Sequence, residues 1–417
     1  MFPSSPYRLT LLVCLAEIFG LASIAAFPAL LPTFQAEWQL SNTAAGWISA
    51  AYYAGYMILV PVLTSITDRI DARRIMGLGA LFAAMSAVGY AYLAQGFWSA
   101  FALRLLSGVS LAGIYMPGLK VVSDHTEGEG TLQSRFVSFY TASFSIGASL
   151  SYLLAGEINA RAGWRWAFMA SAISAVGALV IVILYVPPAR VRSAEKNGAL
   201  LADFKIVLRS KAAMAYVLAY AAHMWELFGL RTWIVAFLAF SIQLQPAGGF
   251  TWRPTQIAFI VSLIGLPASI GGNELSRIFG RRKVITVVMI VSAALGTILG
   301  FSAALPYLLV AFMAILYGIT IIGDSASLTA GVVAVAPAGY RGTTLAVHST
   351  IGFCSAFLSP LAVGVVLDFF GGNRLAWGMG FVCMAAGSLL GPVFLARLKP
   401  DTYRKEDIIK NAFLLLF

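Results

Sequence analysis

The sequence predicts an all-α integral membrane protein with twelve transmembrane helices in two pseudo-symmetric six-helix bundles. Of its 417 residues, 60% are hydrophobic and 11% are charged, whereas a soluble domain carries about 45–50% apolar and about 25% charged residues. A water-soluble core cannot bury this much apolar side chain and still leave a polar surface, so the excess must face lipid. The composition therefore excludes a soluble enzyme, a disordered chain, a collagen and a coiled coil.

Continuous apolar runs, bounded by charge clusters or by Gly and Pro turns, define the predicted spans in order. A membrane helix uses about 20 mostly apolar residues, whereas spanning strands would show alternating segments of about ten residues. Helices also satisfy their own backbone hydrogen bonds inside lipid. The predicted spans cover residues 9–31, 44–65, 75–95, 99–121, 136–157, 165–187, 212–242, 255–272, 284–304, 306–333, 343–369 and 375–396.

A polar segment from Pro187 to Lys211 separates the first six spans from the last six. The predicted parts are an amino-terminal bundle (1–187), a cytoplasmic linker (188–211), a carboxy-terminal bundle (212–397) and a cytoplasmic tail (398–417). A shift of about 209 residues places DRIDARRI over RIFGRRKV and Gly156 close to Gly364. Parallel halves related in this way are one transporter architecture, with the substrate between the halves.

Lys and Arg concentrate in alternate loops. The chain has 28 Lys and Arg residues, two of which lie within spans. With the amino terminus in the cytoplasm, the loops on the opposite side hold only four of them: Arg161, Arg165, Arg253 and Arg374. The positive-inside rule then places both termini in the cytoplasm of a bacterial-type inner membrane. The opening segment lacks a small-residue cleavage site, so we expect a retained first span. The net charge of +11 reflects topology, and no nucleic-acid partner is expected.

Two loops at corresponding places in the halves resemble the signature GxLaDRxGRR of the major facilitator superfamily of secondary transporters. TSITDRIDARR (64–74) keeps the Asp-Arg pair and the trailing basic residues, with Thr64, Asp71 and Ala72 as departures. NELSRIFGRR (273–282) keeps the late Gly and its basic pair, with Arg277 in the acidic position. The resemblance covers nearly the whole chain and implies alternating access. It also implies gating roles for Asp68, Arg69, Arg73, Arg281 and Arg282, with Asp68 near the start of span eleven.

Spans four and five bear on the type of transporter within this family. RLLSGVSLA (104–112) resembles the RxxQGxGxA pattern of many proton-coupled members, with Ser107 and Ser110 replacing the usual Gln and Gly. The Gly-Pro signature of many drug/proton antiporters is missing from FYTASFSIGASLSYLLAG (139–156). The two replacements disfavour proton transfer through Arg104, and the missing signature disfavours a multidrug exporter.

Ionisable residues inside the spans are the strongest candidates for a site, because a charge at mid-helix costs about 2.5–3.5 kcal/mol on insertion scales. In the resembled fold, spans one, four, seven and ten line the central cavity, and all of these residues lie there. They are Glu17, Arg104, His223, Glu226, Arg231 and Asp324.

His223 and Glu226 are three residues apart and share a helical face, so together they can hold an exchangeable proton. The alternative is a structural hydrogen bond between packed helices. Glu226 is the predicted proton carrier and Asp324 the next candidate. Arg231 is turned about 140° from Glu226, so we expect it to pair with Asp324 or Glu17, or to bind an anionic substrate.

The predicted substrate-binding set combines these cavity charges with nearby aromatic residues. For Glu17, a gate or snorkelling position is the alternative, and for the aromatic residues it is helix packing. The set comprises Glu17, Arg104, Tyr115, Trp225, Arg231, Tyr317 and Asp324.

The sequence thus predicts a secondary active transporter of a small polar organic solute, with an organic anion or zwitterion favoured, coupled to protons or Na⁺. The alternatives are a drug/proton antiporter, a membrane-embedded enzyme and a non-transporting sensor. No P-loop, GxSxG elbow or HExxH pair occurs, and the cysteines lack CxxC spacing. We therefore expect no catalytic residue, cofactor or metal site, and a monomer in the lipid bilayer.

Overall fold

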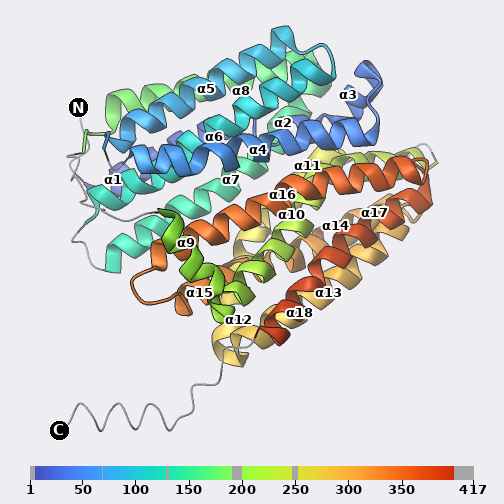
Figure 1. The fold of residues 1–417 in the computed structure, drawn as a ribbon. Helices are drawn as coiled ribbons and strands as arrows, with labels where there is room; N and C mark the ends of the chain where they lie inside the picture. Colours follow the sequence, from blue (N-terminus) through green and yellow to red (C-terminus); the bar gives the residue numbers. More distant parts are fainter. Residues whose placement is uncertain (1–4, 68, 128–130, 190–199, 247–251, 399–417) are drawn as a thin grey trace, which may run out of the picture.

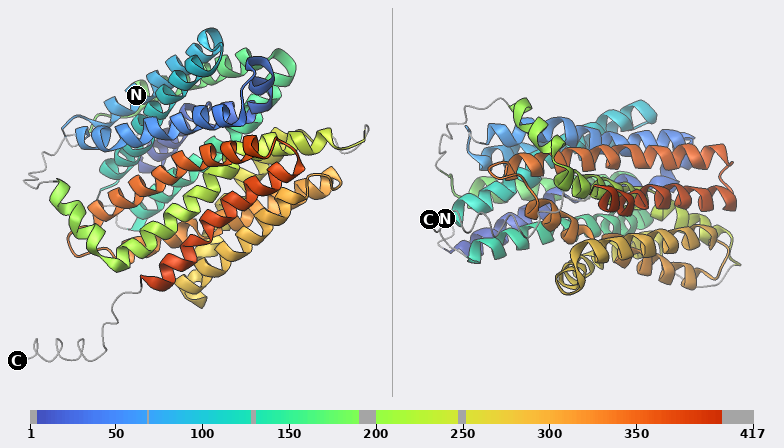
Figure 2. Two further views of the ribbon diagram at one scale, coloured as in Figure 1. Left: turned by 45° about the vertical axis from the view of Figure 1, so that its right-hand side comes forward. Right: turned by 60° about the horizontal axis from the view of Figure 1, so that its bottom comes forward.

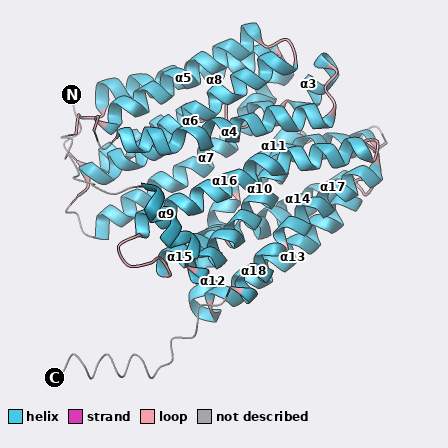
Figure 3. Cartoon of the chain, viewed as in Figure 1, coloured by secondary structure: helices cyan, strands magenta, loops and turns pink. Residues whose placement is uncertain are grey.

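The computed structural model describes residues 5–67, 69–127, 131–189, 200–246 and 252–398, and all regular secondary structure within them is helical (Figure 3). We call residues 5–189 the N half and residues 200–398 the C half. The helices of the N half are α1 (Pro6–Gly20), α2 (Ala26–Ala29), α3 (Leu31–Trp38), α4 (Asn42–Ile66), α5 (Ala72–Leu93), α6 (Phe97–His125), α7 (Thr131–Ala162) and α8 (Trp164–Tyr185).

The C half contains the remaining helices, several of which are paired end to end. These are α9 (Leu200–Arg209), α10 (Lys211–Gln243), α11 (Pro254–Leu263), α12 (Gly265–Phe279), α13 (Arg281–Phe301), α14 (Tyr307–Gly323), α15 (Ser325–Ala334), α16 (Arg341–Phe369), α17 (Arg374–Ser388) and α18 (Leu390–Arg397). Figure 1 shows the helices of each half packed mainly against one another, with α4 and α7 lying beside α16 and α11 where the halves meet. Figure 2 shows that most long helices run along one common direction.

Within the described residues, 11 helical segments are long and apolar enough to cross a membrane. The end-to-end pairs α11–α12, α14–α15 and α17–α18 each count as one segment. The first predicted span differs from the others because it is interrupted: α1 has 15 residues, and residues 21–25 form turns before α2 begins. Pro28 explains part of this break, since it has no N–H to donate to the carbonyl four residues earlier.

Small residues allow the two halves to approach closely where α4 crosses α16. A Cβ atom at Gly46 would lie 2.7 Å from the Pro360 carbonyl oxygen, and one at Gly364 would lie 2.4 Å from the Asn42 carbonyl oxygen. Both distances are below van der Waals contact, so no larger side chain fits without a shift of backbone. The crossing therefore uses the small-residue packing that is typical of membrane helices.

Two carboxylates connect the halves at one end of the molecule, where α4 begins and α16 ends. We call this the outer end. Asp368 accepts hydrogen bonds from the backbone N–H groups of Asn42 (2.9 Å) and Thr43 (2.7 Å) and from the Asn42 amide (2.8 Å). These N–H groups have no partner inside α4 because they lie in its first turn. Asp368 thus ties the C half to the start of α4.

The second carboxylate repeats this arrangement between α7 and α11. Glu157 accepts from the Arg253 guanidinium (2.7 Å) and the Gln256 amide (2.8 Å), both at the start of α11. Gly156 again permits the approach, since a Cβ atom there would lie 2.0 Å from the Thr255 hydroxyl oxygen. The outer end is therefore held shut at two places that correspond in the two halves.

Candidate functional site

The C half contains a buried histidine–aspartate pair. His223 lies in the middle of α10, and Asp324 lies at the break between α14 and α15. His223 Nδ1 and Asp324 Oδ1 are 2.8 Å apart, and the two side chains are 1% and 3% exposed. The two atoms lack the alignment of a hydrogen bond, so the contact is a close approach of the imidazole to the carboxyl group.

Glu226 lies one turn further along α10 but has different neighbours. Its Oε1 accepts hydrogen bonds from the hydroxyls of Ser292 on α13 (3.0 Å) and Tyr317 on α14 (2.9 Å). The expected pairing of His223 with Glu226 is therefore wrong. Although the two residues lie on one side of α10, their side chains do not bond each other, because each has its partner on another helix of the C half.

Glu17 on α1 occupies the corresponding place in the N half. A shift of about 209 residues, the offset of the two halves, places Glu17 on Glu226. Its carboxyl accepts a hydrogen bond from the Ser143 hydroxyl on α7, while Oε1 has no partner and the residue is 0% exposed. Each half thus buries one carboxyl group that is held by hydroxyl donors instead of a cation.

Arg104 on α6 is a buried cation with unused donors. Its Nη1 donates to the Ile24 carbonyl oxygen (3.2 Å), and its guanidinium lies over the Tyr52 ring, 4.4 Å from the centroid. Nε and Nη2 have no partner, although the residue is only 1% exposed. Buried cations are normally paired, so these N–H groups are unsatisfied donors in the interior of the N half.

Arg231 on α10 faces the same region from the C half. Its guanidinium lies 5.3 Å from the centre of the Phe228 ring and, in the described part of the chain, makes no ion pair. The expected pairing with Asp324 or Glu17 is wrong, since those carboxyl groups are held by His223 and Ser143.

Tyrosines connect the two arginines across the interface between the halves. The charges of Arg104 and Arg231 both act on the hydroxyl groups of three tyrosines, which are Tyr52 and Tyr53 on α4 and Tyr152 on α7. Tyr152 also donates its hydroxyl to the Arg231 carbonyl oxygen. A cavity of about 10 Å³ lies beside Tyr152 and Arg231, which is room for about one water molecule. It is lined by Tyr152, Leu227, Leu230, Arg231, Ile234, Val261, Ser262, Ile321 and Ile322.

The three predicted aromatic contacts pack within their own halves. The Tyr115 ring lies 5.1 Å from the Phe144 ring, and the Trp225 indole donates to the Cys383 carbonyl oxygen (3.1 Å). Tyr317 is fully buried beside Glu226. Tyr53, by contrast, crosses to the other half: its ring lies 4.6 Å from the Phe228 ring, which packs against Arg231.

Among the predicted gating residues, two arginines act as matching ties inside the halves. Arg73 donates to the Ile183 carbonyl oxygen near the end of α8 (2.8 Å), and Arg282 donates to the Leu395 carbonyl oxygen in α18 (3.4 Å). A cation at a helix carboxy terminus satisfies carbonyls that have no partner within the helix. Arg281 likewise approaches the Ala330 carbonyl of its own half (3.5 Å).

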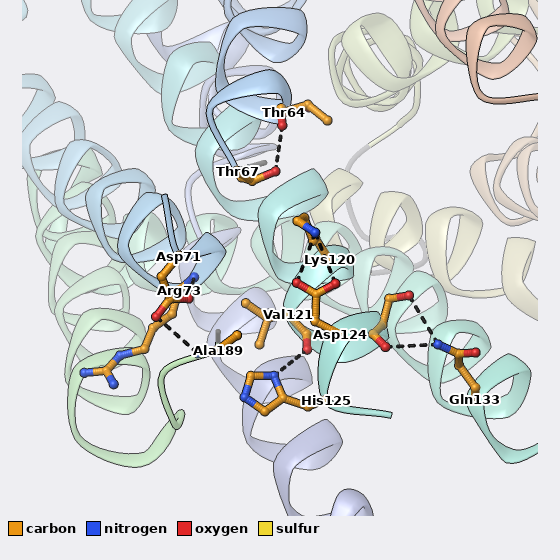
Figure 4. A network of polar contacts seen from close by, with 11 residues as sticks. Thr64, Thr67, Asp71, Arg73, Lys120, Val121, Asp124, His125, Gln133 and Ala189 are labelled. Carbon is orange, nitrogen blue, oxygen red and sulfur yellow. Dashed lines mark hydrogen bonds and ion pairs between the residues drawn. The ribbon is translucent and has the colours of Figure 1, made fainter. Parts of the chain in front are cut away.

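Of the two remaining residues predicted to act in gating, the structure describes only one. Arg69 is exposed, and Asp68 lies outside the described residues. Figure 4 shows the surrounding loop, in which Asp71 accepts from the backbone N–H groups of Arg73 (3.0 Å) and Ala189 (3.3 Å). Asp71 replaces a glycine of the resembled signature, and it caps α5 and holds the chain that leaves α8.

Serines that hold the buried groups were not predicted from the sequence. They include Ser143 and Ser292, which bind the two carboxyl groups, and Ser151, which binds the backbone of the interrupted first span. The spans contain many serines, and no spacing distinguishes these. Only the packing of the helices selects them.

Comparison with known proteins identifies the family. The model of the Major Facilitator Superfamily matches residues 13–273. The chain is 22% identical over 367 residues to the sphingosine-1-phosphate transporter SPNS2 of Mus musculus, covering 81% of this chain and 66% of that protein. It is 25% identical over 210 residues to protein spinster homolog 3 of Danio rerio, covering 48% and 41%. The match spans less than half the length of the latter relative.

Solved structures share the fold at low sequence identity. A D-xylose-proton symporter has a TM-score of 0.75 at 17% identity, covering 95% of this chain and 98% of that one. A bacterial homolog of the human lysosomal transporter Spinster, in an inward-facing and unoccupied conformation, has a TM-score of 0.73 at 13% identity, covering 94% and 95%. The relatives are transporters and not enzymes. As the family model and the shared fold show, and as the two signature loops predicted, the chain belongs to the Major Facilitator Superfamily.

Proposed function

We propose that this chain is a secondary active transporter that moves an amphipathic organic anion by alternating access coupled to protons. The observation that carries the proposal is the pair Arg104 and Arg231, which face one region from opposite halves without an acidic partner among the described residues. The alternating-access part follows the family, and the substrate class and the coupling are our inference.

The arginines suit an anion because a guanidinium can present two parallel N–H groups to a carboxylate or a phosphate. Arg104 is buried, where an unpaired cation is costly, so an incoming anion would supply its missing interactions. The surrounding Tyr52 and Phe228 rings supply apolar contact for the rest of the molecule. Two relatives are named as sphingosine-1-phosphate transporters, and that compound is itself an amphipathic anion. A zwitterion fits the same groups.

Coupling to protons is supported by the buried acids of the C half. Glu226 accepts hydrogen bonds from the hydroxyls of Ser292 and Tyr317, which can bond a neutral carboxyl group as well as a carboxylate, and Asp324 lies against His223. Rearrangement of α10 against α13 and α14 would change these neighbours and so the proton occupancy. Sodium coupling and drug/proton antiport are the rival outcomes of the test below.

The proposed setting is a bacterial inner membrane with both termini in the cytoplasm and a monomeric chain. The distribution of Lys and Arg supports the orientation. Labelling of a single cysteine at Asn197 by an impermeant reagent in intact cells would contradict it, because that residue belongs to the proposed cytoplasmic linker.

The transport test uses purified protein in liposomes with an imposed pH gradient or Na⁺ gradient. Four probes share one hexyl chain and differ only in the head group: hexyl phosphate, heptanoate, hexyltrimethylammonium and hexyl glucoside. We expect gradient-driven flux of the anions with a pH gradient, and loss of that flux in Arg104→Gln and Arg231→Gln. Arg277→Gln is the matched control, because that side chain is 68% exposed and pairs with Glu274 on its own helix. Flux of the cation alone would refute the anion proposal in favour of drug export.

A further inference from the structure

The interrupted first span leaves two carbonyls without helical partners. Pro28 cannot donate to the Ile24 carbonyl oxygen, and Ala26 N–H donates to Ser23 instead of Ala22. In an apolar interior, such groups need partners from elsewhere. Arg104 takes the Ile24 carbonyl, as described above.

A single hydroxyl replaces the missing hydrogen bond across the break. Ser151 on α7 donates to the Ala22 carbonyl oxygen (2.7 Å) and accepts from the Ala25 N–H (3.0 Å). Ser151 is 0% exposed, so no solvent competes for these groups. Ser171 on α8 is a second donor to the Ala22 carbonyl, at 3.2 Å, and also bonds its own helix.

The clamped turn is adjacent to the carbonyl that orients the arginine. Ile24 lies between Ala22 and Ala25, the two residues that Ser151 binds, so the hydroxyl determines where the Ile24 carbonyl points. That carbonyl holds Nη1 of Arg104 and leaves Nε and Nη2 free. Discontinuous helices of this kind bring backbone groups to the binding sites of other transporters.

We propose that Ser151 is a positioning residue of the anion site: it holds the turn of residues 21–25 so that Ile24 fixes the Arg104 guanidinium with two N–H groups free for the substrate. The part that concerns the substrate rests on the proposed function. The part that concerns the turn and Arg104 stands without it.

The test compares four serine variants with the parent protein in neutral detergent, and the binding measurement adds Arg104→Gln. Ser151→Ala removes the clamp, and Ser151→Thr retains the hydroxyl. Ser171→Ala removes only the second donor, which gives a milder variant if Ser151→Ala does not fold. Ser149→Ala is the matched control, because Ser149 lies on the same helix, is 0% exposed and, among the described residues, bonds only the Ser145 carbonyl oxygen.

Two readouts need no ligand. Hydrogen exchange, followed by mass spectrometry, reports on the amides of residues 21–26, and phenylglyoxal modification reports on the Arg104 guanidinium. We expect Ser151→Ala to accelerate both, Ser171→Ala to accelerate them less, and the Thr and Ser149 variants to match the parent. Unchanged exchange and unchanged modification in Ser151→Ala would overturn the proposal.

The third readout is the affinity for hexyl phosphate, measured by the shift in melting temperature during titration. Loss of one oriented hydrogen bond predicts about tenfold weaker binding in Ser151→Ala, with recovery in Ser151→Thr. Parent-like affinity in Ser151→Ala, together with no binding in Arg104→Gln, would refute the positioning role. Binding that is equal in the parent and in Arg104→Gln, or absent from both, would instead refute the anion function, and the exchange and modification rates would still decide the role of Ser151.

Discussion

Replacing Asp368 by Asn should open the outer end of the transporter. The carboxylate accepts three hydrogen bonds of 2.7–2.9 Å from the start of α4. Asn keeps the shape but loses the charge, and its amide nitrogen cannot accept. The interaction of a charge with a helix amino terminus is worth about 0.3–1 kcal/mol when exposed and up to about 2 when partly buried.

The expected change in free energy is the sum of two terms: the lost interaction of the charge with the helix amino terminus, and the lost hydrogen bonding. A net hydrogen bond contributes about 1 kcal/mol, so we expect about 2 kcal/mol in total against the closed outer end. By the rule that 1.4 kcal/mol is tenfold, the ratio of closed to open molecules should fall by roughly thirtyfold.

The assay is a distance measurement by pulsed electron paramagnetic resonance. Spin labels at Ala36 and Arg374 lie on exposed positions near the outer end of the two halves. Asp368→Asn should add a population at longer distance. Glu274→Gln is the control, because Glu274 is exposed and, in the part of the chain that the structure describes, pairs only with Arg277 three residues away. An unchanged distance distribution in Asp368→Asn would refute the reasoning.

Three further outcomes are expected. Glu226→Gln should abolish accumulation driven by a pH gradient while leaving substrate exchange largely intact, because Gln resembles the protonated acid; accumulation at the parent level would shift the proton role to Asp324. Gly364→Ala should favour the open outer end, since its Cβ would meet the Asn42 carbonyl oxygen at 2.4 Å, and the same spin labels would show it. Arg73→Ala should lower the melting temperature, as it removes a tie to the end of α8; an unchanged melting temperature would contradict this.

Much of the fold is predictable from the sequence because lipid imposes simple rules. Long apolar runs must form helices that satisfy their own backbone, so the spans follow from composition and length. The first span is the exception, since apolar content alone does not show that residues 21–25 leave the helix. Pro28 is a local signal for that break, but the Ser151 hydroxyl, which bonds the backbone groups that the break leaves without helical partners, belongs to a helix that is distant in the sequence.

The sequence by itself determined the family, the spans and the charged positions of the candidate site. Glu17, Arg104, Glu226 and Arg231 are recognisable because ionisable groups are rare inside lipid-spanning helices. Only the tertiary structure decided which groups meet. His223 contacts Asp324 and not Glu226, although Glu226 is nearer in the sequence. The spacing along a helix decides which side chains share one side of it, whereas the helices packed against that side supply their partners.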